Sequence, residues 1–233
     1  MNYGQHSKNV GGSKLKKNYK AIIFDLDGTL IDTEINYRAM KVAIVNKLRE
    51  KYNIDFDNEQ IYKARVTEIL SYVLSKVEER ERNAVIQLVF ETAEEFEMPA
   101  AKEAKLRKNV ITVLEELKKR GIKLAVITNE GKRVTMFLVD SFGITDYFDI
   151  IVTRDDVGVL KPNPKGLLKI IDFLKVDKSQ ILLIGDSPID IETARNAGIT
   201  AWGVLNGFGK REELIAKGAE RILDNIDDLL KFI

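Results

Sequence analysis

Apolar residues recur along this chain with two different periods. From residue 106 onward, short apolar runs typical of buried strands alternate with amphipathic segments typical of helices. The expected strands are 123–127, 150–152, 181–184 and 200–204. The expected helices are 108–120, 132–142, 164–174, 188–197 and one at the C-terminus. This alternation predicts an α/β fold, with a parallel sheet covered by helices on both faces.

An earlier apolar run, Ile22-Ile23-Phe24, is a further strand of the same sheet. Between it and residue 106 the pattern is only helical, with no strand-like run. Three helices are expected there, at 34–52, 57–77 and 79–97, the last ended by Met98-Pro99. We therefore expect an inserted α-helical cap. The predicted parts are a flexible N-terminal extension (1–19), an α/β core (20–32 and 106–233) and the helical cap (33–105).

Composition narrows the class of protein. The chain has 233 residues, 45% of them hydrophobic and 31% charged, which is enough for a full core under a charged surface. Its net charge of +1 argues against a nucleic-acid partner, and no apolar run is long enough to span a membrane. Residues 1–19 lack the apolar centre of a secretory signal, so we expect a cytoplasmic protein.

Two absences restrict the chemistry. The sequence has no cysteine, which excludes thiolate nucleophiles, disulfides and cysteine-ligated metals. Its one histidine, His6, lies in the polar N-terminal stretch, so imidazole catalysis in the core is disfavoured. Carboxylates, lysines and hydroxyl groups remain, and oxygen ligands favour Mg²⁺ over zinc or iron.

Two carboxylates follow the first strand. Asp25 and Asp27 are separated by one residue and precede Gly28, where the strand pattern ends. Strand alternation would place both side chains on one side, at the carboxyl end of the sheet where open α/β folds bind ligands. Adjacent carboxylates repel each other unless a divalent cation lies beside them or one stays protonated. The pair predicts a metal-assisted carboxylate nucleophile; an acidic turn with no function is the alternative.

Two other strands also end in polar residues, Thr128-Asn129 and Asp186, and Lys161 lies on the loop between them. The carboxyl ends of parallel strands share one edge, so these side chains can converge. Together they suit phosphoryl transfer. A carboxylate can attack phosphorus, the threonine and asparagine can donate hydrogen bonds to phosphoryl oxygens, and the lysine adds positive charge.

The chain resembles the haloacid-dehalogenase-superfamily phosphohydrolases, in particular the helical-cap type that includes phosphoglycolate phosphatases and β-phosphoglucomutases. The similarity covers residues 20–31 and 106–220. Four segments carry it, in order: Asp25-Leu26-Asp27-Gly28-Thr29, Thr128-Asn129, Lys161-Pro162 and Gly185-Asp186-Ser187-Pro188-Ile189-Asp190.

The resemblance implies a Rossmann-like core and assigns roles to its residues. Asp25 would be the nucleophile and Asp27 the general acid and base. Asp25, the backbone carbonyl of Asp27 and Asp186 would ligate Mg²⁺, and Asp190 would orient either the water of Asp186 or Lys161. Thr128, Asn129 and Lys161 would bind phosphate. Arg65, in the second cap helix, is the candidate for substrate specificity, although the glycine that often follows such an arginine is missing here.

The expected reaction is therefore Mg²⁺-dependent hydrolysis of a small phosphorylated metabolite through an aspartyl phosphate, by a monomer or small homo-oligomer. Two alternatives stay open. One is a phosphomutase of the β-phosphoglucomutase type, which core residues cannot separate from a phosphatase. The other is an inactive binding or regulatory protein on the same fold, which a missing catalytic residue would favour. Hydrolysis of a carbon–halogen bond is disfavoured by Asp27.

Overall fold

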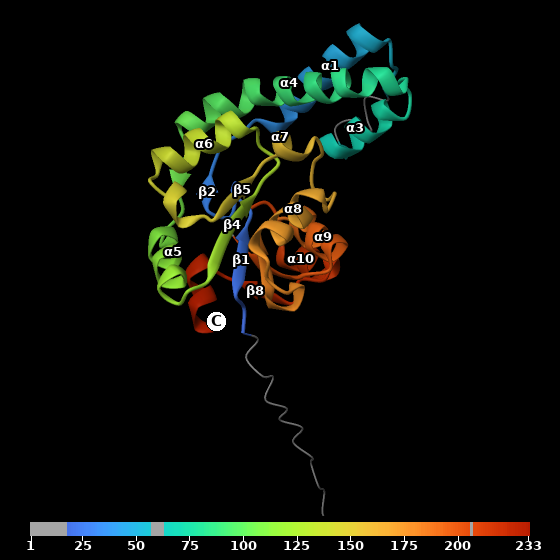
Figure 1. Cartoon of the computed structure of the whole chain (residues 1–233). Helices are drawn as coiled ribbons and strands as arrows, with labels where there is room; N and C mark the ends of the chain where they lie inside the picture. The colour runs from blue at the N-terminus through green and yellow to red at the C-terminus, as the bar shows by residue number, and fades with distance from the viewer. Residues whose placement is uncertain (1–17, 57–62, 206) are drawn as a thin grey trace, which may run out of the picture.

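A single parallel sheet forms the centre of the molecule (Figure 1). The computed structural model describes residues 18–56, 63–205 and 207–233. The sheet order is β5-β4-β1-β6-β7-β8, and every neighbouring pair is parallel. The strands are β1 Ala21–Phe24, β4 Lys123–Ile127, β5 Ile150–Val152, β6 Ile181–Gly185, β7 Thr200–Val204 and β8 Arg221–Leu223. This confirms the predicted α/β architecture.

Alternate strand residues face two separate hydrophobic layers. Ile22 and Phe24 pack into the layer beneath α5 (Val110–Lys119) and α6 (Lys132–Ser141). Ile23, between them, packs into the layer beneath α8 (Lys165–Leu174) and α9 (Pro188–Ala197). Both layers are needed because a parallel sheet buries its two faces. The elements around the sheet are α5 Val110–Lys119, α6 Lys132–Ser141, α7 Arg154–Val157, α8 Lys165–Leu174, α9 Pro188–Ala197, α10 Arg211–Lys217, and the 3₁₀ helices η2 Thr145–Tyr147, η3 Lys178–Gln180 and η4 Ile226–Lys231.

The inserted helices lie together beyond one end of the sheet (Figure 1). They are α1 Tyr37–Tyr52, α3 Val66–Leu74, the 3₁₀ helix η1 Glu79–Glu81 and α4 Arg82–Lys102. Their buried apolar residues form a third hydrophobic cluster, distinct from the two layers of the sheet. Among the described residues, no helix combines the length and the apolar character that crossing a bilayer requires.

The sequence predicts that the third helix of the insertion ends at Met98-Pro99, but the structure shows a longer helix. Helix α4 continues through Pro99 to Lys102. A proline inside a helix removes a backbone hydrogen bond, so packing must hold the last turn. Ala101 is buried in the layer under α5 and α6, and Met98 packs against that layer. Helix α4 therefore runs from the cap into the core.

Two further expectations need adjustment. The chain beyond β7 is not one helix, because β8 and η4 follow α10. Strand β8 begins with an exposed arginine and so lacks the continuous apolar run that marks β5. Tyr19, expected in the flexible extension, is buried edge-on against Trp202 and belongs to the hydrophobic core. The rest of the extension (1–17) and the segment 57–62 of the second cap helix lie outside the described residues.

The chain crosses between core and cap on a small antiparallel ribbon that the sequence did not reveal. Strand β2 (Ile31–Asp32) pairs with β3 (Lys105–Leu106). Arg107, directly after β3, forms an ion pair of 3.0 Å with Asp32 and donates a hydrogen bond to the carbonyl of Gly28. The crossing is thereby connected to the turn that follows β1.

A buried ion pair provides a second connection between α4 and the core. Arg154, at the start of α7, holds Glu97 of α4 through both guanidinium ends, and both side chains are at least 95% buried. The guanidinium also donates to the carbonyl of Asn129 at 2.8 Å and to that of Phe90 at 3.0 Å. Glu97 in turn accepts from the backbone N–H of Gly131 at 3.3 Å. The pair thus links the cap to the loop after β4.

We expect each half of this pair to be destabilising when left alone. Removing one partner of a buried ion pair leaves an uncompensated charge, which costs about 3–5 kcal/mol of unfolding free energy. Glu97→Leu and Arg154→Met should each lose stability on that scale. The double variant should lose clearly less than the sum of the two, by about 2–3 kcal/mol. Urea unfolding of the four proteins measures this coupling.

The matched control is Glu95 with Lys47, an ion pair of 2.8 Å between the same helix α4 and α1. Both of these side chains are more than one-third exposed, so solvent screens the attraction. The same cycle with Glu95→Leu and Lys47→Met should give a coupling well under about 1 kcal/mol. Additive losses at Glu97 and Arg154 would contradict a structural role for the buried pair.

Candidate active site

Three carboxylates meet at the carboxyl edge of the sheet. Asp25 follows β1, Asp186 follows the adjacent strand β6, and Asp190 lies in the first turn of α9. One oxygen from each lies within 4.8 Å of the others, and all three residues are buried. Adjacent parallel strands bring Asp25 and Asp186 together, as the sequence predicted. Asp190 joins them because Ser187 caps α9 and donates from both its N–H and its hydroxyl to Asp190 Oδ2.

Lys161 is the cation of this cluster. Its ammonium contacts Asp25 Oδ1 and donates to Asp190 Oδ1 at 2.6 Å. Burial by itself lowers the Lys161 pKa, but the charges of Asp190 and Asp25 outweigh it and hold the pKa above its usual range. Its backbone N–H donates to Asn129 Oδ1 at 2.7 Å. The lysine is therefore fixed and charged.

One ammonium does not balance three buried carboxylates. Burial and the neighbouring Asp190 raise the pKa of Asp186 to about 6. Burial, followed by the charge of Asp190, raises the pKa of Asp25 well above its usual value. The ionised cluster thus needs more positive charge, and its donors are the hard oxygens that Mg²⁺ prefers. The residues present fit a magnesium ion.

Glycine permits the close approach around Asp186. The carboxylate accepts from the Thr29 hydroxyl at 3.0 Å and from the N–H of Phe208 at 2.6 Å. Gly28 has φ +83°, and a Cβ there would lie 2.5 Å from Asp186 Oδ2. A glycine at position 28 is therefore required both by the conformation of the turn and by the packing of the acidic cluster.

Asp27 lies in the same cavity as Asp25 but has different partners. Strand β1 ends at Phe24, so strict alternation does not extend to Asp27. Its carboxylate accepts from the backbone N–H of Thr33 and from the hydroxyl of Tyr37, both at 2.9 Å. Burial raises the Asp27 pKa, which favours the protonated form. Its side chain thus suits proton transfer. Among the described residues, the carboxylate cluster consists of Asp25, Asp186 and Asp190 and does not include the Asp27 side chain.

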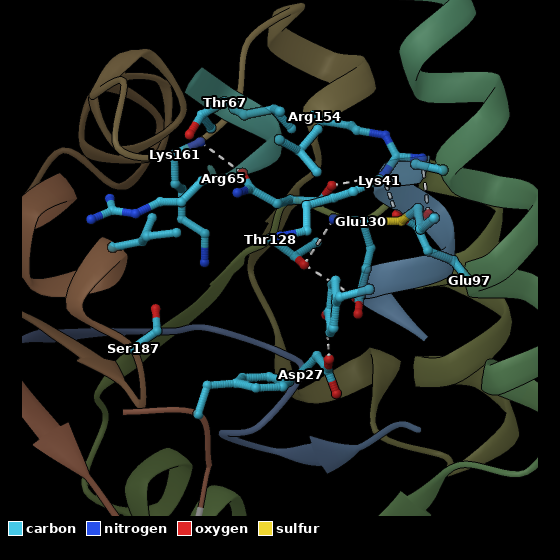
Figure 2. Close-up of a pocket in the computed structure, with 18 of the residues that line it drawn as sticks. Asp27, Lys41, Arg65, Thr67, Glu97, Thr128, Glu130, Arg154, Lys161 and Ser187 are labelled. Carbon is cyan, nitrogen blue, oxygen red and sulfur yellow. Dashed lines mark hydrogen bonds and ion pairs between the residues drawn. The ribbon is translucent and has the colours of Figure 1, made fainter. Parts of the chain in front are cut away.

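A cavity of about 370 Å³ joins these groups to the cap. Seven of the candidate residues line it: Asp25, Asp27, Arg65, Thr128, Asn129, Lys161 and Asp186. Asp190 lies behind them, against Lys161. Figure 2 shows Arg65 and Lys161 on one side of the cavity and Glu130 and Glu97 on the other. The volume is that of a small-molecule site.

Arg65 reaches the cavity from the start of α3. Its side chain is 39% exposed and lies 3.9 Å from Glu68, a weak ion pair in that setting. Lys41 and Lys63 also line the cavity, so this part of the cap is basic. The arrangement leaves Arg65 able to meet a ligand.

Two residues of the site escaped the sequence analysis. The sequence pattern places Tyr37 only within a predicted cap helix (34–52), although its hydroxyl donates a hydrogen bond to Asp27. Glu130 directly follows Thr128-Asn129, and its carboxylate accepts from the Thr128 hydroxyl at 3.1 Å. The one feature of the sequence that points to Glu130 is its position directly after Thr128-Asn129. Tyr37 had no such signal, because its contact with Asp27 depends on how the cap is placed.

Comparison with known proteins finds relatives over most of the chain. The haloacid dehalogenase-like hydrolase family model matches residues 22–204. A putative pyrophosphatase PpaX from Caldanaerobacter subterraneus subsp. tengcongensis is 30% identical over 217 residues, 91% of this chain and 94% of that protein. A phosphoglycolate phosphatase from Yersinia pestis is 30% identical over 225 residues, 93% of this chain and 94% of that protein.

The same relationship holds in three dimensions. The crystal structure of a putative haloacid dehalogenase-like hydrolase from Bacteroides fragilis superposes with a TM-score of 0.67 at 28% identity. The match covers 91% of this chain and 99% of that one. The family match spans all four signature segments, from Asp25 to Asp190. The chain therefore belongs to the haloacid dehalogenase-like hydrolase family and is an enzyme, with phosphatases among its relatives over most of its length.

Proposed function

We propose that this enzyme hydrolyses small phosphate monoesters through a phosphoryl group carried on Asp25. The observation that supports this most directly is the convergence of Asp25, Asp186 and Asp190 on Lys161 beneath the cavity. Carboxylates at this density suit a nucleophile beside a metal ion, and the fixed ammonium suits a phosphoryl group.

The proposed reaction has two steps. An oxygen of Asp25 attacks phosphorus, the bond to the ester oxygen breaks, and protonated Asp27 gives its proton to the departing alcohol. Asp27, now a carboxylate, then takes a proton from water, which attacks the aspartyl phosphate and releases inorganic phosphate. Tyr37 and the N–H of Thr33 keep Asp27 in place for both transfers.

Asp25, Asp186 and the backbone carbonyl of Asp27 are the proposed ligands of Mg²⁺, which would supply positive charge for the ionised nucleophile and the phosphate. Asp190 positions Lys161. Thr128, Asn129 and Lys161 are the proposed phosphate ligands. Because Asn129 Oδ1 accepts from Lys161, its amide nitrogen is the end directed to donate.

The proposed substrate carries a second negative group. Arg65, Lys41 and Lys63 make the cap side of the cavity basic, and a guanidinium binds carboxylate or phosphate oxygens bidentately. The names of two relatives, a phosphoglycolate phosphatase and a putative pyrophosphatase, denote substrates of this kind. We further propose that residues 33–105 form the cap and 20–32 with 106–233 the core, and that closure at the β2–β3 crossing excludes water.

Asp25→Asn should abolish turnover while the fold persists. The amide has nearly the same shape as the carboxylate but is not a competent nucleophile. The test is phosphate release from a panel of phosphorylated metabolites and from p-nitrophenyl phosphate, with Mg²⁺. Urea unfolding verifies that the variant is folded. A folded variant that releases phosphate at a rate comparable to the parent would overturn the proposed nucleophile.

Removal of divalent cations should stop the reaction, and Mg²⁺ should restore it. Calcium should not substitute, because it accepts six to eight oxygen ligands in looser geometry and can take both oxygens of Asp25. Initial rates are measured after chelation and after return of each cation. Full activity in excess chelator, or with Ca²⁺ alone, would contradict the proposed metal site.

Arg65→Ala should lower kcat/KM for the best dianionic or carboxylated substrate by roughly 10- to 100-fold, about 1.4–3 kcal/mol. The rate with p-nitrophenyl phosphate should change little, since that ester has no second anionic group. Arg80→Ala is the control, because Arg80 is an exposed cap arginine outside the cavity lining. Equal losses on both substrates would assign Arg65 to the structure of the cap instead.

A further inference from the structure

The hydroxyl proton of Thr128 is held by its neighbour Glu130. The hydroxyl donates to Glu130 Oε2 at 3.1 Å and accepts from the Glu130 backbone N–H at 3.2 Å (Figure 2). A threonine hydroxyl has one proton and two lone pairs. While that proton points to Glu130, Thr128 cannot donate it to a phosphoryl oxygen, which is its proposed task.

The carboxyl group of Glu130 is buried, and only one of its two oxygens has a hydrogen-bond partner among the described residues. Its side chain lines the cavity yet is 95% buried, and Oε1 has no hydrogen-bond partner among the described residues. Burial raises the Glu130 pKa well above its usual value, and the nearby charges of Asp27 and Glu97 raise it further. Thr128 and Lys161 oppose this shift but do not offset it.

The groups around Glu130 give an ionised carboxylate little support. Lys161 directs its ammonium to Asp25 and Asp190, and Arg154 is paired with Glu97. The hydroxyl of Tyr37, on α1, donates to Asp27. A phosphate dianion entering beside Thr128 would add repulsion, because like charges disfavour the ionised form of a carboxyl group. Bound phosphate and ionised Glu130 are therefore mutually unfavourable.

We propose that Glu130 is a positioning residue that, once protonated, donates to Thr128 Oγ1 and so frees the Thr128 hydroxyl proton for a phosphoryl oxygen. This inference rests on the proposed function. Thr128 Oγ1 then accepts from the Glu130 carboxyl and the Glu130 N–H, and donates to phosphate, so all its hydrogen-bonding capacity is used. No covalent bond changes: one proton passes from solvent to Glu130 when phosphate binds.

The consequence is a defined pH dependence. Phosphate binding takes up a proton wherever Glu130 is ionised in the free enzyme. The affinity for phosphate therefore falls as the pH rises through the pKa of Glu130, approaching about tenfold per pH unit above it. Other groups of the site titrate as well, so the informative quantity is the difference between the parent and a variant that lacks only this carboxyl group.

Glu130→Gln supplies that variant. The glutamine amide donates to Thr128 Oγ1 at every pH and carries no charge. Binding of inorganic phosphate in the presence of Mg²⁺ is measured by calorimetry across the pH range, in buffers of different ionisation enthalpy to count protons. We expect the variant to bind within about threefold of the parent at low pH, and to lack the extra alkaline loss and one proton of uptake.

The control is Glu115→Gln on α5, an exposed glutamate outside the cavity lining, which should keep the profile of the parent. Glu130→Met, an apolar residue of similar length, also removes the titrating group and tests the same point if the glutamine variant does not fold. The steady-state pH profile with p-nitrophenyl phosphate provides the corresponding kinetic comparison.

Several outcomes would overturn the role of Glu130. One is a Glu130→Gln or Glu130→Met protein with the same alkaline loss of phosphate affinity as the parent. Another is a folded Glu130→Gln protein that binds phosphate more than about tenfold more weakly at every pH, since the carboxylate itself would then be needed. Both leave the proposed phosphatase activity intact. A parent enzyme without affinity for phosphate or turnover of any ester would overturn both proposals.

Discussion

Burial of negative charge at one edge of the sheet is the constraint on which this site depends. Asp25, Asp186 and Asp190 come from three different elements, and each loses hydration on folding. The ammonium of Lys161 offsets part of this by bonding Asp25 and Asp190, and thereby holds its own loop against β1 and α9. Asp27 and Glu130 sit in the same water-poor region and have raised pKa values for the same main reason, burial. Burial thus favours a cation bound to the carboxylate cluster and favours the protonated forms of Asp27 and Glu130 nearby.

Helix α4 connects this charged edge to the cap. It packs in the cap cluster with Val89 and Phe90, continues through Pro99, and reaches the core with Ala101. On the way, Glu97 meets Arg154, and the pair bonds the carbonyl of Asn129 and the N–H of Gly131. The loop that carries the proposed phosphate ligands is therefore supported from the cap side. Arg65 caps a different helix of the insertion, α3, and among the described residues its partly exposed side chain forms only a 3.9 Å ion pair with Glu68.

At Thr128 the site includes Glu130, which none of the four signature segments contains. A threonine at the end of a strand needs only a free hydroxyl proton to bind phosphate, and here that proton is held by Glu130. A buried carboxyl group at this place makes sense if its neutral form is used, since the ionised form would both retain the proton and repel phosphate. The burial that favours a metal beside Asp25 and a proton on Asp27 acts on Glu130 as well. No cation site is proposed beside Glu130, so its negative charge is neutralised by protonation.

The sequence by itself determined the parallel sheet, the inserted helices and the residues at the strand ends. These follow from local pattern, because buried strands are short apolar runs and the chain direction places their carboxyl ends at one edge. The tertiary structure alone decided what depends on contacts between distant segments. Pro99 stays helical because the core packs its last turn, Tyr37 reaches Asp27 across the cap boundary, and Arg154 finds Glu97 57 residues away. Burial itself is a property of the folded molecule, so only the assembled site shows that Glu130 is not a solvated loop glutamate but a buried acid bound to Thr128.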